Sequence, residues 1–190
     1  VGGIDEESTR VAELVYGEFV DNEIHAMKSA RTAEAVKLFE GVYRDVNIAL
    51  ANELATLADE LAVDVRAAID AANTQPYCDL HAPGPGGGGH CIPWYPYFIT
   101  YHTSHGAPML ETARRVNDGM PEFTVETVRR QLAHIGRTLD GSTVGVFGVT
   151  YRPGVAETRA SPARPIIDGL SGADAHVVVV DPMVDDFSEY

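Results

Sequence analysis

The chain has 190 residues, 45% of them hydrophobic, which is enough to form the core of one domain or one and a half. Its formal net charge of −14 would repel a phosphate backbone, and no basic patch interrupts the acidic composition, which argues against nucleic-acid binding. No apolar run has membrane-spanning length and no signal-peptide pattern is present, so we expect a soluble, cytoplasmic protein without a membrane partner. Two lysines against twelve arginines, with the acidic surplus, are typical of a halophilic composition.

Helical periodicity dominates the first two thirds of the chain. Residues 1–3 look like the end of a buried strand, and residues 8–20 carry apolar positions spaced for one helix face. The longest periodic segment covers residues 32–61, where apolar residues recur at three- and four-residue steps. A helix of that length needs a partner along its apolar stripe, and we expect a second copy of the chain to supply it in a homodimer. Shorter helices are predicted over 63–72 and 121–137.

The last fifty residues have a different pattern. Residues 144–149 and 176–180 predict buried strands, and Ser161-Pro162 marks the start of a helix between them. These three elements form one βαβ unit, about half of a doubly wound domain. We therefore predict an α/β chain: an all-α central dimerisation domain over 1–137, followed by a partial Rossmann-like, doubly wound α/β domain over 138–190.

A connection rich in Pro, Gly, His and Tyr spans residues 73–106, and connections of this length in a compact domain are usually functional. Within it, the segment 83–93 reads PGPGGGGHCIP and ends in Cys91. Glycines let the main chain approach a ligand and present its N–H groups, and a thiol there is placed to attack a bound carbonyl. The loop formally matches the Gly-x-Gly-x-x-Gly dinucleotide fingerprint, but no strand precedes it and Pro93 opposes a following helix.

The residues that could carry chemistry in this chain also have less specific interpretations. Cys91 could be an inert buried thiol, and Lys37 could be a lysine that only extends from an apolar helix to solvent. Cys78, His81, His90 and Cys91 could form a zinc site, although the adjacent His90 and Cys91 would point apart in an extended segment. Arg152 and Arg159 could simply pair with acidic neighbours.

The sequence nevertheless resembles the UDP-glucose/GDP-mannose dehydrogenase family. Residues 33–54, AEAVKLFEGVYRDVNIALANEL, are similar to the central dimerisation helix of that family. The loop that ends in Cys91 resembles the family's nucleophile loop and looks most like that of the UDP-N-acetyl-D-mannosamine dehydrogenase branch. Residues 147–153 and 157–162 are similar to the start of the family's UDP-binding domain.

The resemblance implies an NAD-dependent oxidation of a UDP-sugar C6 alcohol to a carboxylate through a cysteine thioester. Cys91 would be the nucleophile, and Lys37 would stabilise the oxyanion and orient the hydrolytic water. The loop amides of Gly86, Gly87 and Gly88 would contact the sugar. Tyr151 and Arg152 would hold the uridine diphosphate.

Two positions depart from the family pattern. Gly41 stands where the family usually has Asn, and Tyr95 stands where it usually has Asp. The NAD-binding domain is expected to precede Val1, so the resemblance implies that NAD is bound mainly outside this chain. Two hypotheses remain: the substrate-binding and dimerisation part of a nucleotide-sugar dehydrogenase, or a non-catalytic, degenerate module that dimerises or binds UDP-sugars.

Overall fold

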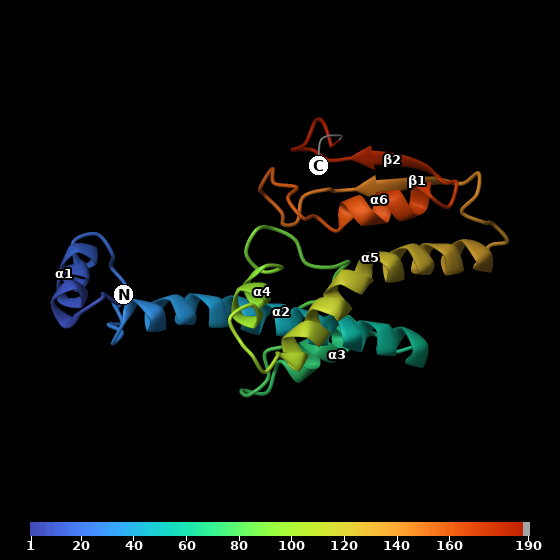
Figure 1. Cartoon of the computed structure of the whole chain (residues 1–190). Coiled ribbons are helices and arrows are strands. Elements are labelled where there is room, and N and C mark those ends of the chain that lie inside the picture. The colour runs from blue at the N-terminus through green and yellow to red at the C-terminus, as the bar shows by residue number, and fades with distance from the viewer. Residues whose placement is uncertain (188–190) are drawn as a thin grey trace. The chain divides into compact units, whose positions relative to one another are not determined.

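The computed structural model describes residues 1–187, and it divides the chain into two compact units, residues 1–43 and residues from 44 onward. The helix α2, Ala30–Leu61, runs from the first unit into the second. This helix agrees with the long segment predicted over 32–61 (Figure 1). The predicted domain boundary at 137/138 does not coincide with the division into units and stays a prediction.

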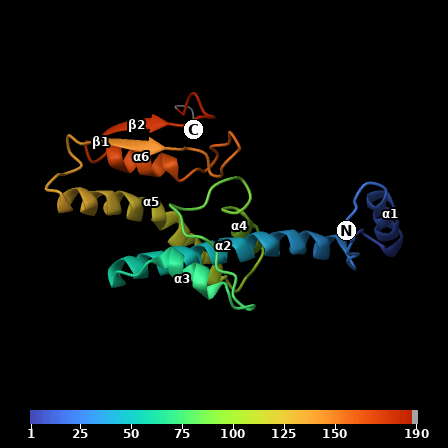
Figure 2. The ribbon, with the colours of Figure 1, turned by 180° about the vertical axis from the view of Figure 1, so that it is seen from behind.

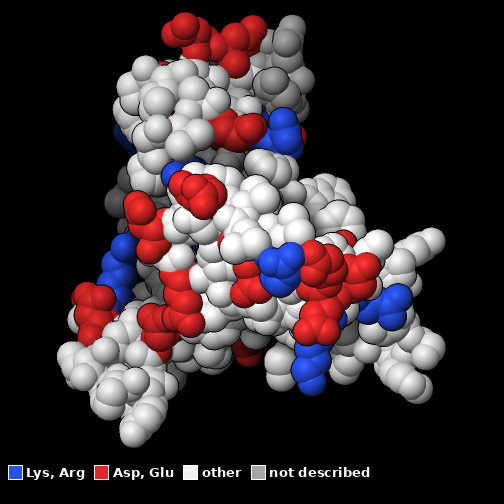
Figure 3. Space-filling model, turned by 90° about the vertical axis from the view of Figure 1, so that its left-hand side faces the viewer, with Lys and Arg blue, Asp and Glu red and all other residues white. Residues whose placement is uncertain are grey.

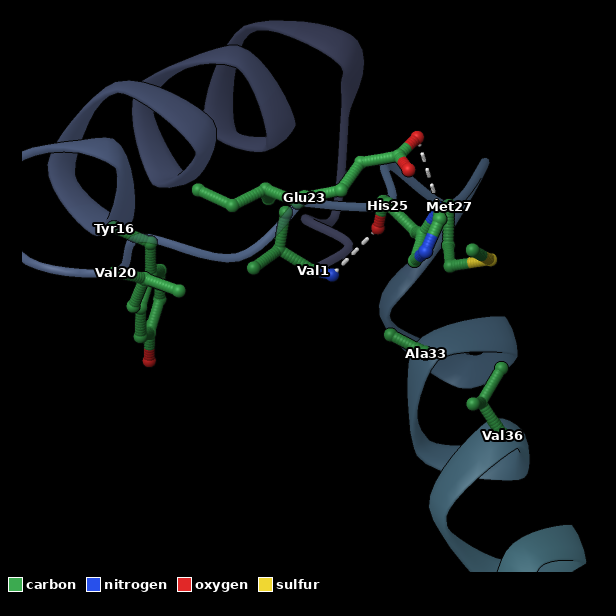
Figure 4. Close-up of a pocket in the computed structure, with 9 residues that line it drawn as sticks. Val1, Tyr16, Val20, Glu23, His25, Met27, Ala33 and Val36 are labelled. Carbon is green, nitrogen blue, oxygen red and sulfur yellow. Dashed lines mark hydrogen bonds and ion pairs between the residues drawn. The ribbon is translucent and has the colours of Figure 1, made fainter.

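The first unit contains α1, Glu6–Gly17, and the beginning of α2. The helix α1 starts at a capping box in which the Asp5 side chain accepts a hydrogen bond from the Ser8 backbone N–H, so it lies slightly earlier than the predicted 8–20. Residues 1–3 are irregular rather than the predicted strand end, and they are hydrogen-bonded to the segment before α2: Met27 N–H donates to Val1 O at 2.7 Å. A hollow of about 290 Å³ in this unit is lined by mainly apolar residues between 1 and 36 (Figure 4).

The second unit begins with the rest of α2 and the short helices α3, Val65–Ala72, and α4, Tyr95–Thr100. The start of α3 is fixed by Asp64, whose carboxylate accepts from the N–H groups of Arg66 and Ala67, and it confirms the helix predicted near 63–72. The helix α4 lies inside the connection predicted as irregular. Its sequence, YPYFIT, is too short to show a helical period.

The helix α5, Pro108–His134, corrects the helix predicted over 121–137. Pro121 was interpreted as the first residue of a helix, where its missing N–H costs nothing. The structure places Pro121 inside α5 and Pro108 in the first turn instead. Proline in a helix interior removes one backbone hydrogen bond, and Pro121 is buried at that point of α5 together with Met120 and Val125.

The C-terminal part is a small α/β layer. The strands β1, Thr143–Phe147, and β2, His176–Val180, pair in parallel with Val146 opposite Val179, and α6, Ala163–Ser171, connects them. Figures 1 and 2 show α6 between the two strands and α5. Its core consists of four buried side chains, Val125, Leu139, Ile166 and Leu170. The parallel βαβ unit confirms the predicted α/β class.

Acidic side chains are prominent on the face of the molecule that Figure 3 shows, as the net charge of −14 leads one to expect. Among residues 1–187, no helix combines the length and the apolar composition needed to cross a membrane.

Candidate active site

The glycine-rich loop is held at three points along its length. Gly84 N–H donates to Asn52 Oδ1 on α2 at 2.8 Å. Gly86 has a φ of +130° and lies so near α5 that a Cβ atom added to it would come within 3.2 Å of the Asn117 carbonyl oxygen. Gly89 N–H donates to the Arg159 carbonyl at 2.9 Å. The loop is therefore fixed between α2, α5 and the segment before α6.

Tyr151 covers the middle of this loop. A Cβ atom on Gly88 would lie 2.4 Å from Tyr151 Cβ and 3.1 Å from the Ala160 carbonyl oxygen. Gly89, with a φ of +89°, lies under the same ring, and an added Cβ would come within 3.1 Å of it. Glycine is thus required at both positions by close approach, and the predicted residues Gly88 and Tyr151 are brought together.

Cys91 follows directly and is half-buried. Its carbonyl oxygen accepts hydrogen bonds from the N–H groups of Trp94 and Tyr95, both at 3.0 Å, and this turn leads into α4. Cys91 and Cys78 are both free thiols. The thiol of Cys91 therefore stands at the end of a loop with a fixed course and immediately before a helical turn.

The backbone two residues before Tyr151 is hydrogen-bonded to the end of the small sheet. The Asp181 carboxylate, just after β2, accepts from Val149 N–H at 2.8 Å and from Met183 N–H at 2.8 Å. These backbone hydrogen bonds, led by that from Val149, hold the pKa of Asp181 below its usual value. Arg152, the other residue predicted to hold the diphosphate, is exposed, while the Arg159 guanidinium lies 3.9 Å from Glu157.

Lys37 lies on α2 in the first unit, whereas all other predicted site residues belong to the second unit. Its side chain is mostly exposed, and its ammonium group lies 3.1 Å from Glu40 Oε2. The structure thus brings together Gly86, Gly87, Gly88, Cys91 and Tyr151 within one unit, and it describes Lys37 within the other.

Gly87 lines two neighbouring hollows of the second unit. One, of about 220 Å³, lies toward α6 and includes Asn117 and Ser161 in its wall. The other, of about 340 Å³, lies toward α4 and includes Trp94 and Arg114. A Cβ atom on Gly87 would meet nothing within 4 Å, so the backbone there is open on both sides. This openness suits the predicted contact between the loop amides and a ligand.

A group of buried polar side chains lies beneath the loop. Arg114 donates to Asp45 Oδ1 at 2.5 Å, and it also contacts the Asp118 carboxylate. Burial raises the pKa of Asp45, and the Arg114 charge and the Asn117 amide oppose that rise. The Asn117 side chain donates a hydrogen bond to Asp45 and accepts one from Asn52, and Asn52 in turn accepts one from Gly84 N–H.

Sequence reasoning did not identify these polar residues as part of the site. Asp45 and Asn52 are seven residues apart on α2 and therefore share one helix face, and Arg114 and Asn117 are three apart on α5. Polar residues at helical spacing within an otherwise apolar stripe were the available signal.

The described residues do not fit a dinucleotide site. The fingerprint needs a strand before its glycines and a helix directly after them. Residues 81–88 form neither strand nor helix, and neither β1 nor β2 leads into such a glycine pattern. We therefore assign no NAD-binding residue in this chain. Within residues 1–187, no three His, Cys, Asp or Glu side chains converge as metal ligands.

A helical segment that presents a thiol on a glycine loop, followed by the start of a parallel α/β layer, is the arrangement of a nucleotide-sugar dehydrogenase family. Residues 31–119 match the central domain of the UDP-glucose/GDP-mannose dehydrogenase family, and residues 145–190 match its UDP-binding domain. The chain belongs to the UDP-glucose/GDP-mannose dehydrogenase family.

Individual relatives agree with this assignment. The chain is 43% identical to the UDP-N-acetyl-D-mannosamine dehydrogenase of Methanocaldococcus jannaschii over 98% of its own length and 42% of that protein. The solved UDP-D-ManNAc dehydrogenase of Pyrococcus horikoshii is 38% identical, with a TM-score of 0.92 over 96% of this chain and 44% of that one. A UDP-glucose dehydrogenase from Pyrobaculum islandicum is 31% identical, with a TM-score of 0.85 over 96% of this chain and 42% of that one. The chain spans less than half the length of these relatives.

Proposed function

We propose that the chain is the substrate-binding and dimerisation part of an NAD-dependent nucleotide-sugar 6-dehydrogenase, of the UDP-N-acetyl-D-mannosamine or UDP-glucose type. The observation that carries the proposal is the glycine loop, which ends in Cys91 and is clamped between the central-domain helices and the UDP-binding segment. Gly84 bonds α2, and Gly89 bonds Arg159. A nucleotide bound to the second segment would thus place its sugar beside the loop.

In this proposal the chain's own residues bind the sugar nucleotide and provide the nucleophile. Tyr151 and Arg152 hold the uridine diphosphate, and the amides of Gly86, Gly87 and Gly88 contact the sugar. The Cys91 sulfur adds to the C6 aldehyde that the first oxidation produces, and the resulting hemithioacetal becomes a thioester when it loses a hydride. Water then hydrolyses the thioester to the carboxylate and releases the thiol. Lys37 supplies a positive charge to an oxyanion formed at C6. The uridine contacts rest on the match of residues 145–190 to the UDP-binding domain.

Oxidation of the C6 alcohol to a carboxylate releases two hydrides, one in each step, and two NAD molecules would accept them. We propose that NAD is bound mainly by a domain outside residues 1–190, because the glycine loop has neither the preceding strand nor the following helix that a dinucleotide fingerprint needs. The roles proposed here for this chain's residues are binding, orientation and nucleophilic attack. A homodimer formed through α2, a cytoplasmic location and adaptation to high salt remain predictions.

The second hypothesis, a non-catalytic module, is favoured by two residues. Gly41 and Tyr95 replace an amide and a carboxylate that the family usually carries at these positions. The Tyr95 N–H donates to the Cys91 carbonyl in the turn after Cys91, and a residue with a purely structural role can make the same hydrogen bond. The two hypotheses differ in what they predict for the Cys91 thiol, because a binding module needs no reactive sulfur.

Alkylation of the two free thiols tests the proposal. With limiting iodoacetamide and mass-spectrometric peptide mapping, we expect Cys91 to react faster than Cys78. Saturating UDP-N-acetyl-D-mannosamine should protect Cys91 and leave Cys78 unchanged, since Cys78 lies outside the glycine loop. Cys78 is thus the internal control for unfolding and for reagent depletion.

UDP alone, UDP-glucose and GDP-mannose complete the comparison. Protection by the UDP-sugars that exceeds protection by UDP supports contact between the sugar and the Cys91 loop. Protection by UDP alone, without any contribution from a sugar, favours the binding-module hypothesis. Equal labelling of both thiols, independent of every ligand, would reject the assignment of the loop.

A further inference from the structure

Two fully buried amides connect the glycine loop to the ion pair beneath it. Asn52 and Asn117 are 0% and 1% exposed. Each lies in a helix, and an apolar residue such as leucine at either position would have a higher helix propensity than asparagine. Burying an amide is costly unless its donors and acceptors are paired. Here they are paired with one another and with the loop, which makes this a built network.

The direction of these hydrogen bonds is fixed at both ends by backbone groups. Gly84 N–H is a donor and therefore requires an oxygen of Asn52 at 2.8 Å. The Asn52 Nδ2 then faces Asn117 Oδ1 at 2.9 Å, and the Asn117 Nδ2 faces the Asp45 carbonyl oxygen at 3.0 Å. Reversing either amide would oppose two acceptors or two donors, so the relay has a single favourable arrangement.

The ion pair holds the far end of the relay. Asp45 is 0% exposed, and its carboxylate receives both Arg114 and the Asn117 amide, the latter at 2.9 Å. Breaking a buried charge pair is costly, because it would leave an uncompensated charge. The relay therefore connects the ion pair between α2 and α5 to Gly84, where the loop begins.

We propose that Asn52 and Asn117 are positioning residues that set the course of the glycine loop and thereby the place of the Cys91 thiol. The proposal rests on the proposed role of Cys91 as a nucleophile. The relay acts on Gly84, and the loop then passes Asn117 at Gly86 and reaches Arg159 at Gly89. Displacement of its first anchor consequently affects the residues next to Cys91.

The test replaces Asn52 by leucine, which has nearly the same volume and no hydrogen-bonding group. Amide hydrogen exchange at Gly84 should accelerate about tenfold, as expected for loss of one hydrogen bond. Exchange at Gly89 should also accelerate, although its own acceptor on Arg159 is retained. Alkylation of Cys91 should become several times faster because its half-buried thiol is released, and that of Cys78 should not change.

Asn47→Leu is the matched control. Asn47 lies on the same helix and binds the connection further upstream, donating to Asp79 O at 2.6 Å and accepting from His81 N–H at 3.0 Å. This variant should alter the labelling of Cys78 and leave exchange at Gly89 unchanged. Equal effects of both variants on Cys91, or an Asn52→Leu effect confined to Gly84, would overturn the proposal.

Asn52→Asp keeps the test decisive if the leucine variant does not fold. A protonated aspartic acid can accept from Gly84 and donate to Asn117, whereas an ionised one places two acceptors face to face. At acid pH, amide exchange at Gly89 should be as fast in this variant as in the unmodified chain. At a pH where the new carboxyl is ionised, it should be faster in the variant. A pH-independent difference would contradict the relay. Neither readout needs a nucleotide sugar, so this result is independent of the UDP-sugar protection experiment.

Discussion

Gly88 and Tyr151 are in such close contact that no side chain fits between them. A Cβ atom at position 88 would lie 2.4 Å from Tyr151 Cβ. Gly88 belongs to the loop that ends in Cys91, and Tyr151 belongs to the segment that matches the UDP-binding domain. Because Gly88 has no side chain, the loop that ends in Cys91 can lie directly against the segment that matches the UDP-binding domain.

We predict that Gly88→Ala separates the loop from Tyr151. The added methyl group must displace Tyr151 and the nearby Ala160 carbonyl, and overpacking of this kind costs about 1–3 kcal/mol. The free energy of unfolding, measured by urea titration, should fall by about that amount, and UDP-sugar protection of Cys91 should weaken.

Gly87→Ala is the matched control, because a Cβ atom there meets nothing within 4 Å. It should change the free energy of unfolding by less than about 0.5 kcal/mol, the usual range for a surface substitution. If Gly87→Ala and Gly88→Ala destabilise the protein equally, loop entropy rather than the contact with Tyr151 explains the effect.

Ala160, on the other side of the same contact, has a φ of +50°. This left-handed conformation costs an L-residue about 1–2 kcal/mol and costs glycine almost nothing. Ala160→Gly should therefore raise the free energy of unfolding by about 1 kcal/mol, measured by urea titration. Ala156 lies in the same segment but does not have a positive φ, so Ala156→Gly should lower the free energy of unfolding slightly. A loss of stability in Ala160→Gly would mean that the strain is absent.

The elements with a long helical period or an uninterrupted β-branched run were the ones that the sequence predicted best. The apolar spacing of residues 32–61 is that of α2, and the run HVVVV coincides with β2 over 176–180. The predicted start of α5 was wrong, because the sequence around Pro121 looks the same whether this proline begins a helix or lies inside one. Local rules do not distinguish these cases, since tertiary packing decides whether a proline is tolerated.

The candidate site shows the same division between local and long-range information. Cys91 was found because its loop has an unusual composition that is visible within eleven residues. Asn52 and Asn117 were missed because their hydrogen bond joins residues 65 apart in the chain. A single sequence does not reveal which buried amides face one another, whereas the structure shows the hydrogen bond between these two.

The Asp181 carboxylate should make stability depend on pH. Hydrogen bonds from the N–H groups of Val149 and Met183 lower its pKa in the folded state, so the ionised form favours folding. This contribution is complete above the unfolded pKa of about 3.9 and is lost as the pH falls through the lower, folded value. Between pH 5 and pH 3, Asp181→Asn should therefore lose less stability than the unmodified chain.

The proposed homodimer depends on the apolar residues that α2 exposes. Leu50, Leu57 and Leu61 are 46%, 48% and 73% exposed, and their spacing of seven and four residues places them on one helix face. Large apolar side chains exposed in a row usually mark an interface, because their burial against a partner removes apolar surface from water.

We expect Leu57→Glu to shift the sedimentation equilibrium of the chain from dimer toward monomer, because the interface would have to bury an unpaired charge. Arg44→Glu introduces the same side chain roughly 140° away around the axis of α2, given about 100° per residue, and should leave the dimer intact. The helical content measured by circular dichroism should remain the same in both variants, which separates loss of association from unfolding. A dimer that survives Leu57→Glu but dissociates in Arg44→Glu would place the interface on another face of α2.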